Sequence, residues 1–105
     1  MNKGMYHDVR LLNEETVNLM HSVQYPNSHY GLGWGIVTSS KGYKYIGHEG
    51  GDLGIVTSMY IRESDNIAVI IFVNVSPWTM NAGIWYLMQD ILFMKANSIF
   101  DMSKI

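Results

Sequence analysis

A histidine set among glycines is the part of this chain whose residue types could do chemistry. Residues 47–54 read Gly-His-Glu-Gly-Gly-Asp-Leu-Gly, and both flanking runs, 43–46 and 55–61, are rich in β-branched and aromatic residues. Such flanks are typical of β-strands, so His48 is expected at a strand end where side chains are few. Glycine weakens a sheet unless another group must come close to the backbone. That group could be a substrate, or another part of the chain in a tight bulge or crossing.

The surrounding pattern predicts an α+β fold: a short N-terminal helix, a four-stranded antiparallel meander and a long C-terminal helix packed on the sheet. Asn13 can cap a helix that begins with two glutamates, and Pro26 ends the helical pattern. Polar turns at 39–42 and 62–66 favour antiparallel hairpins between the strands. The strands are expected at residues 30–37, 43–48, 55–61 and 67–73.

The last third of the chain predicts a helix that begins near Pro77, with Thr79 as its N-cap. Trp85, Met88 and Leu92 are expected against the sheet, yet apolar residues surround almost the whole helix. Such a helix needs cover on more than one side, and a four-stranded meander has two open edges. We therefore expect self-association, a partner chain, or a helical region that this chain does not contain.

Composition limits the functional classes. The chain has 105 residues, a net charge of −2, 48% hydrophobic residues and no cysteine. This excludes disorder, disulfides and thiolate chemistry, and argues against nucleic acid or an anionic membrane as the main partner. No apolar run reaches the ~20 residues of a membrane span, and residues 1–10 lack the apolar segment of a signal peptide. The length predicts one domain over residues 1–105.

The order of several motifs resembles the C-terminal part of the β-lactamase-related serine hydrolases, which include class C β-lactamases, penicillin-binding-protein-like carboxypeptidases, D-aminopeptidases and esterases. The motifs that carry the resemblance are Tyr-Gly-Leu-Gly-Trp-Gly at 30–35, Gly-His-Glu-Gly-Gly at 47–51, Gly54, Ser58, and the apolar run 67–72 that closes on Asn74. The resemblance covers about residues 13–95. It implies that this chain is a partial domain: the sheet end of a fold in which an antiparallel sheet packs on an all-helical region, with catalysis at the junction.

Three motifs form the site in that family, and His48-Glu49-Gly50 is similar to the third, His-x-Gly on a sheet strand. The resemblance implies that His48 orients a substrate carbonyl or carboxylate. It also implies that Gly50 lets the substrate lie along the backbone and that the Gly51 N–H points at the developing oxyanion. The implied reaction is hydrolysis of a peptide or small acyl compound through an acyl-serine, without cofactor or metal. The alternative for His48 is a strand-end histidine with no catalytic role.

The nucleophile motif of that family, Ser-x-x-Lys, is missing, because no serine in the sequence precedes a lysine by three positions. Residues 25–27 spell Tyr-Pro-Asn, formally the family's Tyr-x-Asn motif, but they precede the first strand, where the family has a variable loop. Ser58 has no neighbouring base in sequence and is expected to be an ordinary sheet serine.

The other histidines, His7, His21 and His29, lack metal-ligand spacing and are expected to be surface groups. Without a nucleophile, the chain is expected to be inactive alone. Three interpretations stay open: a truncated piece of a longer enzyme, an accessory chain that completes a site with another polypeptide, or a non-catalytic binding or self-association module.

Overall fold

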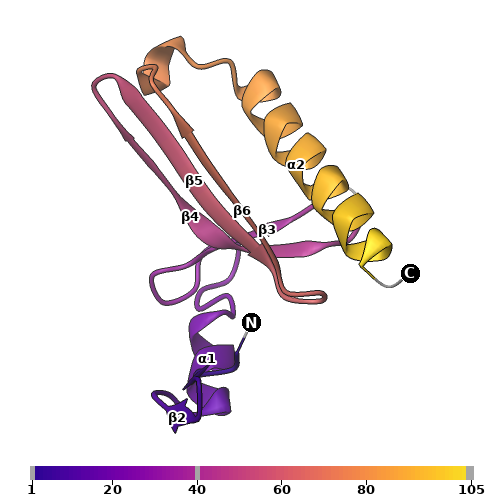
Figure 1. The fold of residues 1–105 in the computed structure, drawn as a ribbon. Coiled ribbons are helices and arrows are strands. Elements are labelled where there is room, and N and C mark those ends of the chain that lie inside the picture. Colours follow the sequence, from indigo (N-terminus) through magenta and orange to yellow (C-terminus); the bar gives the residue numbers. More distant parts are fainter. Residues whose placement is uncertain (1, 40, 104–105) are drawn as a thin grey trace. The chain divides into compact units, whose positions relative to one another are not determined.

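A computed structural model describes residues 2–39 and 41–103 and has the predicted α+β architecture (Figure 1). Strands β3 to β6 form one sheet in sequential order, which confirms the four-stranded antiparallel meander. A two-stranded antiparallel sheet of β1 and β2 near the N-terminus was not predicted. In chain order the elements are β1 (Met5–Tyr6), β2 (Val9–Arg10), α1 (Glu14–Met20), β3 (Gly35–Thr38), β4 (Lys44–Asp52), β5 (Ile55–Arg62), β6 (Ile67–Val73), the 3-10 helix η1 (Pro77–Thr79) and α2 (Ala82–Met102).

The described residues group into two compact units. The first unit takes residues 2–39, 41–48 and 61–66, and the second takes residues 49–60 and 67–103. The boundaries cross β4 after His48 and β5 after Tyr60.

The core of the first unit is a cluster of isoleucines contributed by β3, β4 and β5. Ile36 and Ile46 are direct partners across the β3–β4 pair, and Ile61 joins them with Trp34 packed alongside. The side chain of Ile46 is completely buried. Each buried isoleucine stabilises the fold by about 1.5–3 kcal/mol relative to an exposed one. This cluster holds the first half of β4, from which His48 projects.

Residues 30–34 do not belong to a strand, so the prediction of a strand over 30–37 was wrong in its first half. Tyr30 forms only an isolated bridge to Gly35, and the Gly31 N–H donates to the Trp34 carbonyl at 2.7 Å. Gly33 has a φ of 77°, which closes a turn that few other residues adopt. A Cβ on Gly31 would lie 2.1 Å from the Met20 carbonyl oxygen, so glycine lets this turn lie against the end of α1.

Strand β4 runs further than expected. It continues through Asp52, so Gly50 and Gly51 are strand residues and His48 lies at the centre of the strand instead of at its end. The chain reverses at Leu53 and Gly54, where Gly54 has a φ of 77°. The Gly54 N–H donates to the Ser76 hydroxyl at 2.9 Å, which ties this turn to the segment before η1.

In the second unit α2 packs against β6 (Figure 1). Trp85 and Phe93 are its buried side chains, whereas Met88 is only half-buried and Leu92 is exposed, so Phe93 takes the place that was expected for Leu92. The N-cap is Asn81, whose side-chain oxygen accepts from the Ile84 N–H at 3.1 Å. The prediction of Thr79 was wrong because residues 77–79 form a separate 3-10 turn and Met80 is extended.

Candidate functional site

His48 is exposed on β4, and its ring is held by a tyrosine that the sequence does not single out as a partner. The Nε2 atom of His48 is hydrogen-bonded to the Tyr30 hydroxyl. The two rings meet edge to face, with 5.5 Å between their centroids and an interplanar angle of 90°. The Tyr30 backbone is anchored in turn, since its N–H donates to the Ser28 hydroxyl at 3.0 Å.

A tyrosine hydroxyl against an imidazole nitrogen is a pair that can share a proton. Either group can donate or accept, depending on which ring nitrogen of His48 carries the hydrogen. The arrangement leaves an exposed histidine with one ring nitrogen oriented by a second residue, as orienting and proton-transfer histidines require. Such a pair can hold a carbonyl or carboxylate. It does not replace the serine nucleophile that the sequence lacks.

Glu49, the middle residue of His-x-Gly, points to the other side of the strand. Its Oε1 accepts a hydrogen bond from the Trp85 indole N–H at 3.3 Å, so Glu49 faces α2. Within the second unit, Glu49 therefore joins β4 to α2. No sequence signal could identify this contact, because Glu49 and Trp85 are 36 residues apart.

Gly50 and Gly51 both have a neighbouring side chain close to the place that a Cβ would take. A Cβ on Gly50 would lie 2.7 Å from the Thr57 hydroxyl, and a Cβ on Gly51 would lie 2.6 Å from Pro77 Cγ. Both glycines are exposed otherwise. Close approach of another part of the chain, one of the two alternatives raised by the glycines, is therefore seen at both positions. Substrate contact at Gly50 and an oxyanion role for the Gly51 N–H remain predictions.

Replacing Gly51 with alanine is expected to lower the free energy of unfolding by about 1–3 kcal/mol, because the new methyl group must push Pro77 aside. Urea denaturation followed by circular dichroism measures the loss. The control is the same substitution in a Pro77→Ala background, where the cost should fall. Equal costs in the two backgrounds would show that the packing against Pro77 is not the reason for glycine at this position.

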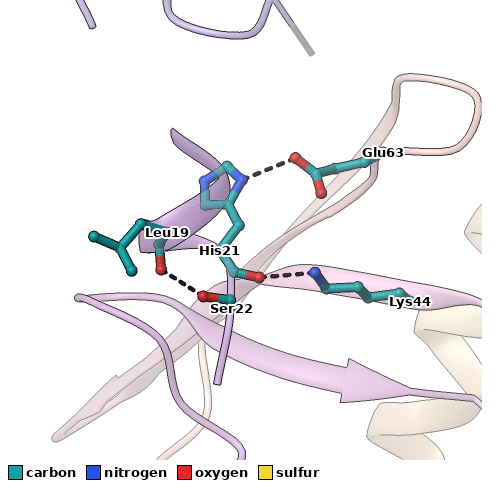
Figure 2. A network of polar contacts seen from close by, with 5 residues as sticks. All are labelled: Leu19, His21, Ser22, Lys44 and Glu63. Carbon is teal, nitrogen blue, oxygen red and sulfur yellow. Dashed lines mark hydrogen bonds and ion pairs between the residues drawn. The ribbon is translucent and has the colours of Figure 1, made fainter. Parts of the chain in front are cut away.

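His21 is buried, so the prediction that it is a surface group was wrong (Figure 2). Its Nδ1 lies 2.8 Å from the Glu63 carboxylate, and its backbone carbonyl accepts from Lys44 Nζ at 2.7 Å. Its ring also meets Trp34 edge to face at 4.8 Å. These contacts join the end of α1 to β4 and to the turn after β5. His21 therefore has a structural role in the first unit, whereas His7 and His29 are exposed as expected.

The remaining sequence candidates are also placed. Ser58 is buried and accepts a hydrogen bond from the Gln89 side chain at 3.1 Å, as suits a sheet serine covered by α2. Tyr25 is exposed, and Asn27 has a φ of 62° in the turn that follows α1.

In residues 2–39 and 41–103 no three His, Asp or Glu side chains gather as metal ligands would. Within the same ranges, no helix combines the length and the apolar character needed to cross a membrane. No protein-family model, no curated protein and no solved structure matches this chain.

Proposed function

We propose that this chain is the sheet-forming, C-terminal part of a β-lactamase-related serine hydrolase, and that by itself it can bind a substrate but cannot hydrolyse it. The observation that carries the proposal is the placement of His48-Glu49-Gly50. The three residues are extended within β4, His48 is exposed, and the Tyr30 hydroxyl orients its ring. A His-x-Gly motif on a sheet strand is what the resemblance implies.

An apolar sheet face supports the proposal. In the second unit, Gln89 of α2 donates to Ser58, so the even-numbered residues of β5 face α2 and Ile55 and Met59 face away from it. Those two side chains are exposed, as are Ile70 and Phe72 on β6. An exposed, contiguous apolar face is uncommon on a monomer. A helical region packed here would supply the second layer that the hydrolase fold needs.

The roles follow from the chemistry of each group. His48 would hydrogen-bond the carbonyl or carboxylate of a peptide or acyl substrate, with Tyr30 keeping the imidazole in one orientation. Gly50 would let the substrate lie along β4, and the Gly51 N–H would stabilise the oxyanion. The serine and lysine of Ser-x-x-Lys would come from additional polypeptide, either upstream in a longer chain or in a partner. No cofactor is required for this reaction.

The test compares the chain alone with a chain extended by any upstream coding sequence that contains an in-frame Ser-x-x-Lys. The chain alone is expected to show no turnover of a p-nitrophenyl ester or a chromogenic cephalosporin. The extended protein is expected to hydrolyse at least one of them. In it, His48→Ala should lower kcat/KM by about 10²-fold, whereas His29→Ala, which removes an exposed histidine outside the strand, should leave kcat/KM unchanged.

Two outcomes would contradict the proposal. Turnover by the chain alone that disappears in His48→Ala would mean a nucleophile that the sequence does not reveal. Full activity of the extended protein with His48→Ala would remove His48 from the site. Absence of any upstream Ser-x-x-Lys would leave the accessory-chain form of the proposal, which is tested by adding candidate partner chains to the same assay.

A second candidate function is a non-catalytic binding module built on the same sheet. It is favoured by β6, an edge strand whose outward side chains Ile70 and Phe72 are both exposed. An edge strand with an apolar face can receive another chain by strand pairing or by packing. Hydrolysis by the extended protein that depends on His48 would decide against this alternative.

A further inference from the structure

Helix α2 has two apolar faces, and only one of them is used within the second unit. The buried face carries Trp85, Gln89 and Phe93, spaced by four residues, of which Gln89 contacts Ser58 and Trp85 contacts Glu49. These contacts, and the packing of α2 on β6, set the rotation of the helix about its own axis.

The opposite side of α2 carries a stripe of four large apolar side chains. Each of them exposes between 54% and 65% of its surface. The four residues are Ile84, Leu87, Ile91 and Met94. Their spacing of three, four and three residues is the a/d spacing of a coiled coil, with β-branched isoleucine at a and leucine or methionine at d. Among parallel coiled coils, this choice of residues favours two strands.

The same register explains the buried face. With Ile84 and Ile91 at a, Trp85 falls at b, Gln89 at f and Phe93 at c. Positions b, c and f are the outer side of a coiled-coil helix, opposite the seam. The sheet therefore covers the outer side of α2 and leaves the seam side exposed.

The charges beside the stripe complete the pattern. Asp90 falls at g and Lys95 at the following e position, five residues later, and both are exposed. In a parallel pair, position g of one helix lies beside the next e of the other, so Asp90 of each helix would meet Lys95 of the other. The two-fold axis would give two such ion pairs in the dimer. An antiparallel pair would bring the two Asp90 carboxylates together.

We propose that α2 is a dimerisation helix, and that its partner is α2 of a second copy of this chain, aligned in parallel through Ile84, Leu87, Ile91 and Met94. For an isolated helix with so short a seam, the cost of forming the helix would offset most of the free energy of pairing. Helix α2 is already held by the sheet, so association costs it less. The seam is short, so we expect dissociation in the micromolar range. The inference does not depend on the hydrolase proposal, and its tests involve no turnover.

The first test measures mass in solution by sedimentation equilibrium between about 1 and 100 μM. The native chain is expected to reach twice the 12.0 kDa of one chain. Ile91→Glu should raise the dissociation constant at least a hundredfold, because it places two carboxylates in the seam. The matched control is Ile99→Glu, since Ile99 is 57% exposed on the same helix but lies at b, outside the seam. Circular dichroism checks that both variants keep their helix.

The second test determines the direction of the pair, and it uses the absence of cysteine from the sequence. In a parallel pair Ile84→Cys faces its own copy, so mild oxidation should yield a covalent dimer. Ile99→Cys should yield none. An antiparallel pair would instead link Ile84→Cys only to Met94→Cys when the two variants are mixed.

The third test concerns the flanking charges. Asp90→Lys should weaken the dimer about two- to fivefold per ion pair lost, and the combination Asp90→Lys with Lys95→Asp should restore it. A native chain that stays monomeric at 100 μM overturns the proposal. So would equal effects of Ile91→Glu and Ile99→Glu, or crosslinking only in the antiparallel combination.

Discussion

Trp85→Ala is expected to lower the free energy of unfolding by about 3–5 kcal/mol. Trp85 is only 5% exposed, in the first turns of α2, and its indole N–H reaches Glu49. Alanine would remove most of the contact between this part of the helix and the sheet and would leave a cavity. Since domains of this size are stable by about 5–15 kcal/mol in total, the variant should be partly unfolded at 25 °C. Urea denaturation followed by circular dichroism is the measurement.

Two further variants separate packing from hydrogen bonding at this position. Trp85→Phe keeps most of the buried surface and loses the hydrogen bond, so its cost should be nearer 1 kcal/mol. Tyr86→Ala removes a neighbouring aromatic ring that is 55% exposed and should change stability by less than about 0.5 kcal/mol. If Trp85→Ala cost no more than Tyr86→Ala, the helix would not be anchored to the sheet through Trp85.

Asp65→Ala should also be strongly destabilising, by about 3 kcal/mol, because it leaves a buried guanidinium without its counter-charge. Arg62 is 3% exposed, and its Nε and Nη2 atoms bind both oxygens of Asp65 at 2.7–3.0 Å. The guanidinium also lies 5.0 Å from the centre of the Tyr43 ring and shares a hydrogen bond with Tyr45. These contacts position the charge but do not neutralise it.

The effect of Asp65→Ala should not change as the pH rises from about 7 to 9. Hydrogen bonding to Asp65 raises the pKa of Arg62 above its ordinary value. Because the pKa of this cation is higher in the folded chain than in the unfolded chain, its contribution to stability is complete below the unfolded-state pKa. That contribution is lost only as the pH rises through the folded-state pKa. The titration of Arg62 therefore lies far above the neutral range.

Removing both partners is the matched control for the ion pair. The double variant Arg62→Leu with Asp65→Ala should cost less than Asp65→Ala alone, since no buried charge is left. Glu14→Ala, which breaks the exposed Lys3–Glu14 ion pair, should leave the denaturation midpoint unchanged. A double variant less stable than Asp65→Ala would mean that Arg62 stabilises mainly through its packing on Tyr43.

Short-range patterns were enough to predict α1, the meander and the last helix, but not β1, β2 or the turn at residues 30–34. The apolar run at 67–73 coincides with β6, and the run at 55–61 differs from β5 by one residue, because strand periodicity and turn residues act within a few positions. Asn13 precedes α1 as expected, although its side chain makes no capping hydrogen bond. Apolar residues surround almost the whole of the last helix, which predicted that the sheet alone would not bury them all. In the structure, α2 has an exposed apolar stripe.

For the candidate site, the sequence predicted the His-x-Gly motif but not the side chains that contact it. The Gly-His-Glu-Gly-Gly motif was recognised in the sequence, but not the hydroxyl of Tyr30 on the His48 ring, because the strand expected over 30–37 put Tyr30 in a ladder instead of a turn. Glycine backbones adopt many conformations, so the sequence of this segment was compatible with both a strand and a turn. In the folded chain Gly31 lies against the end of α1, and the segment is a turn.

Contacts between distant residues lay beyond any local pattern. His21 and Glu63 are 42 residues apart and Ser58 and Gln89 are 31 apart, so neither pair leaves a trace in the spacing of the sequence. The same holds for Gly51 against Pro77, a close contact that no spacing in the sequence indicates. Residue types and their periods specify which segments become strands and helices. Which side chains then meet depends on how those segments pack, and that is a property of the folded chain.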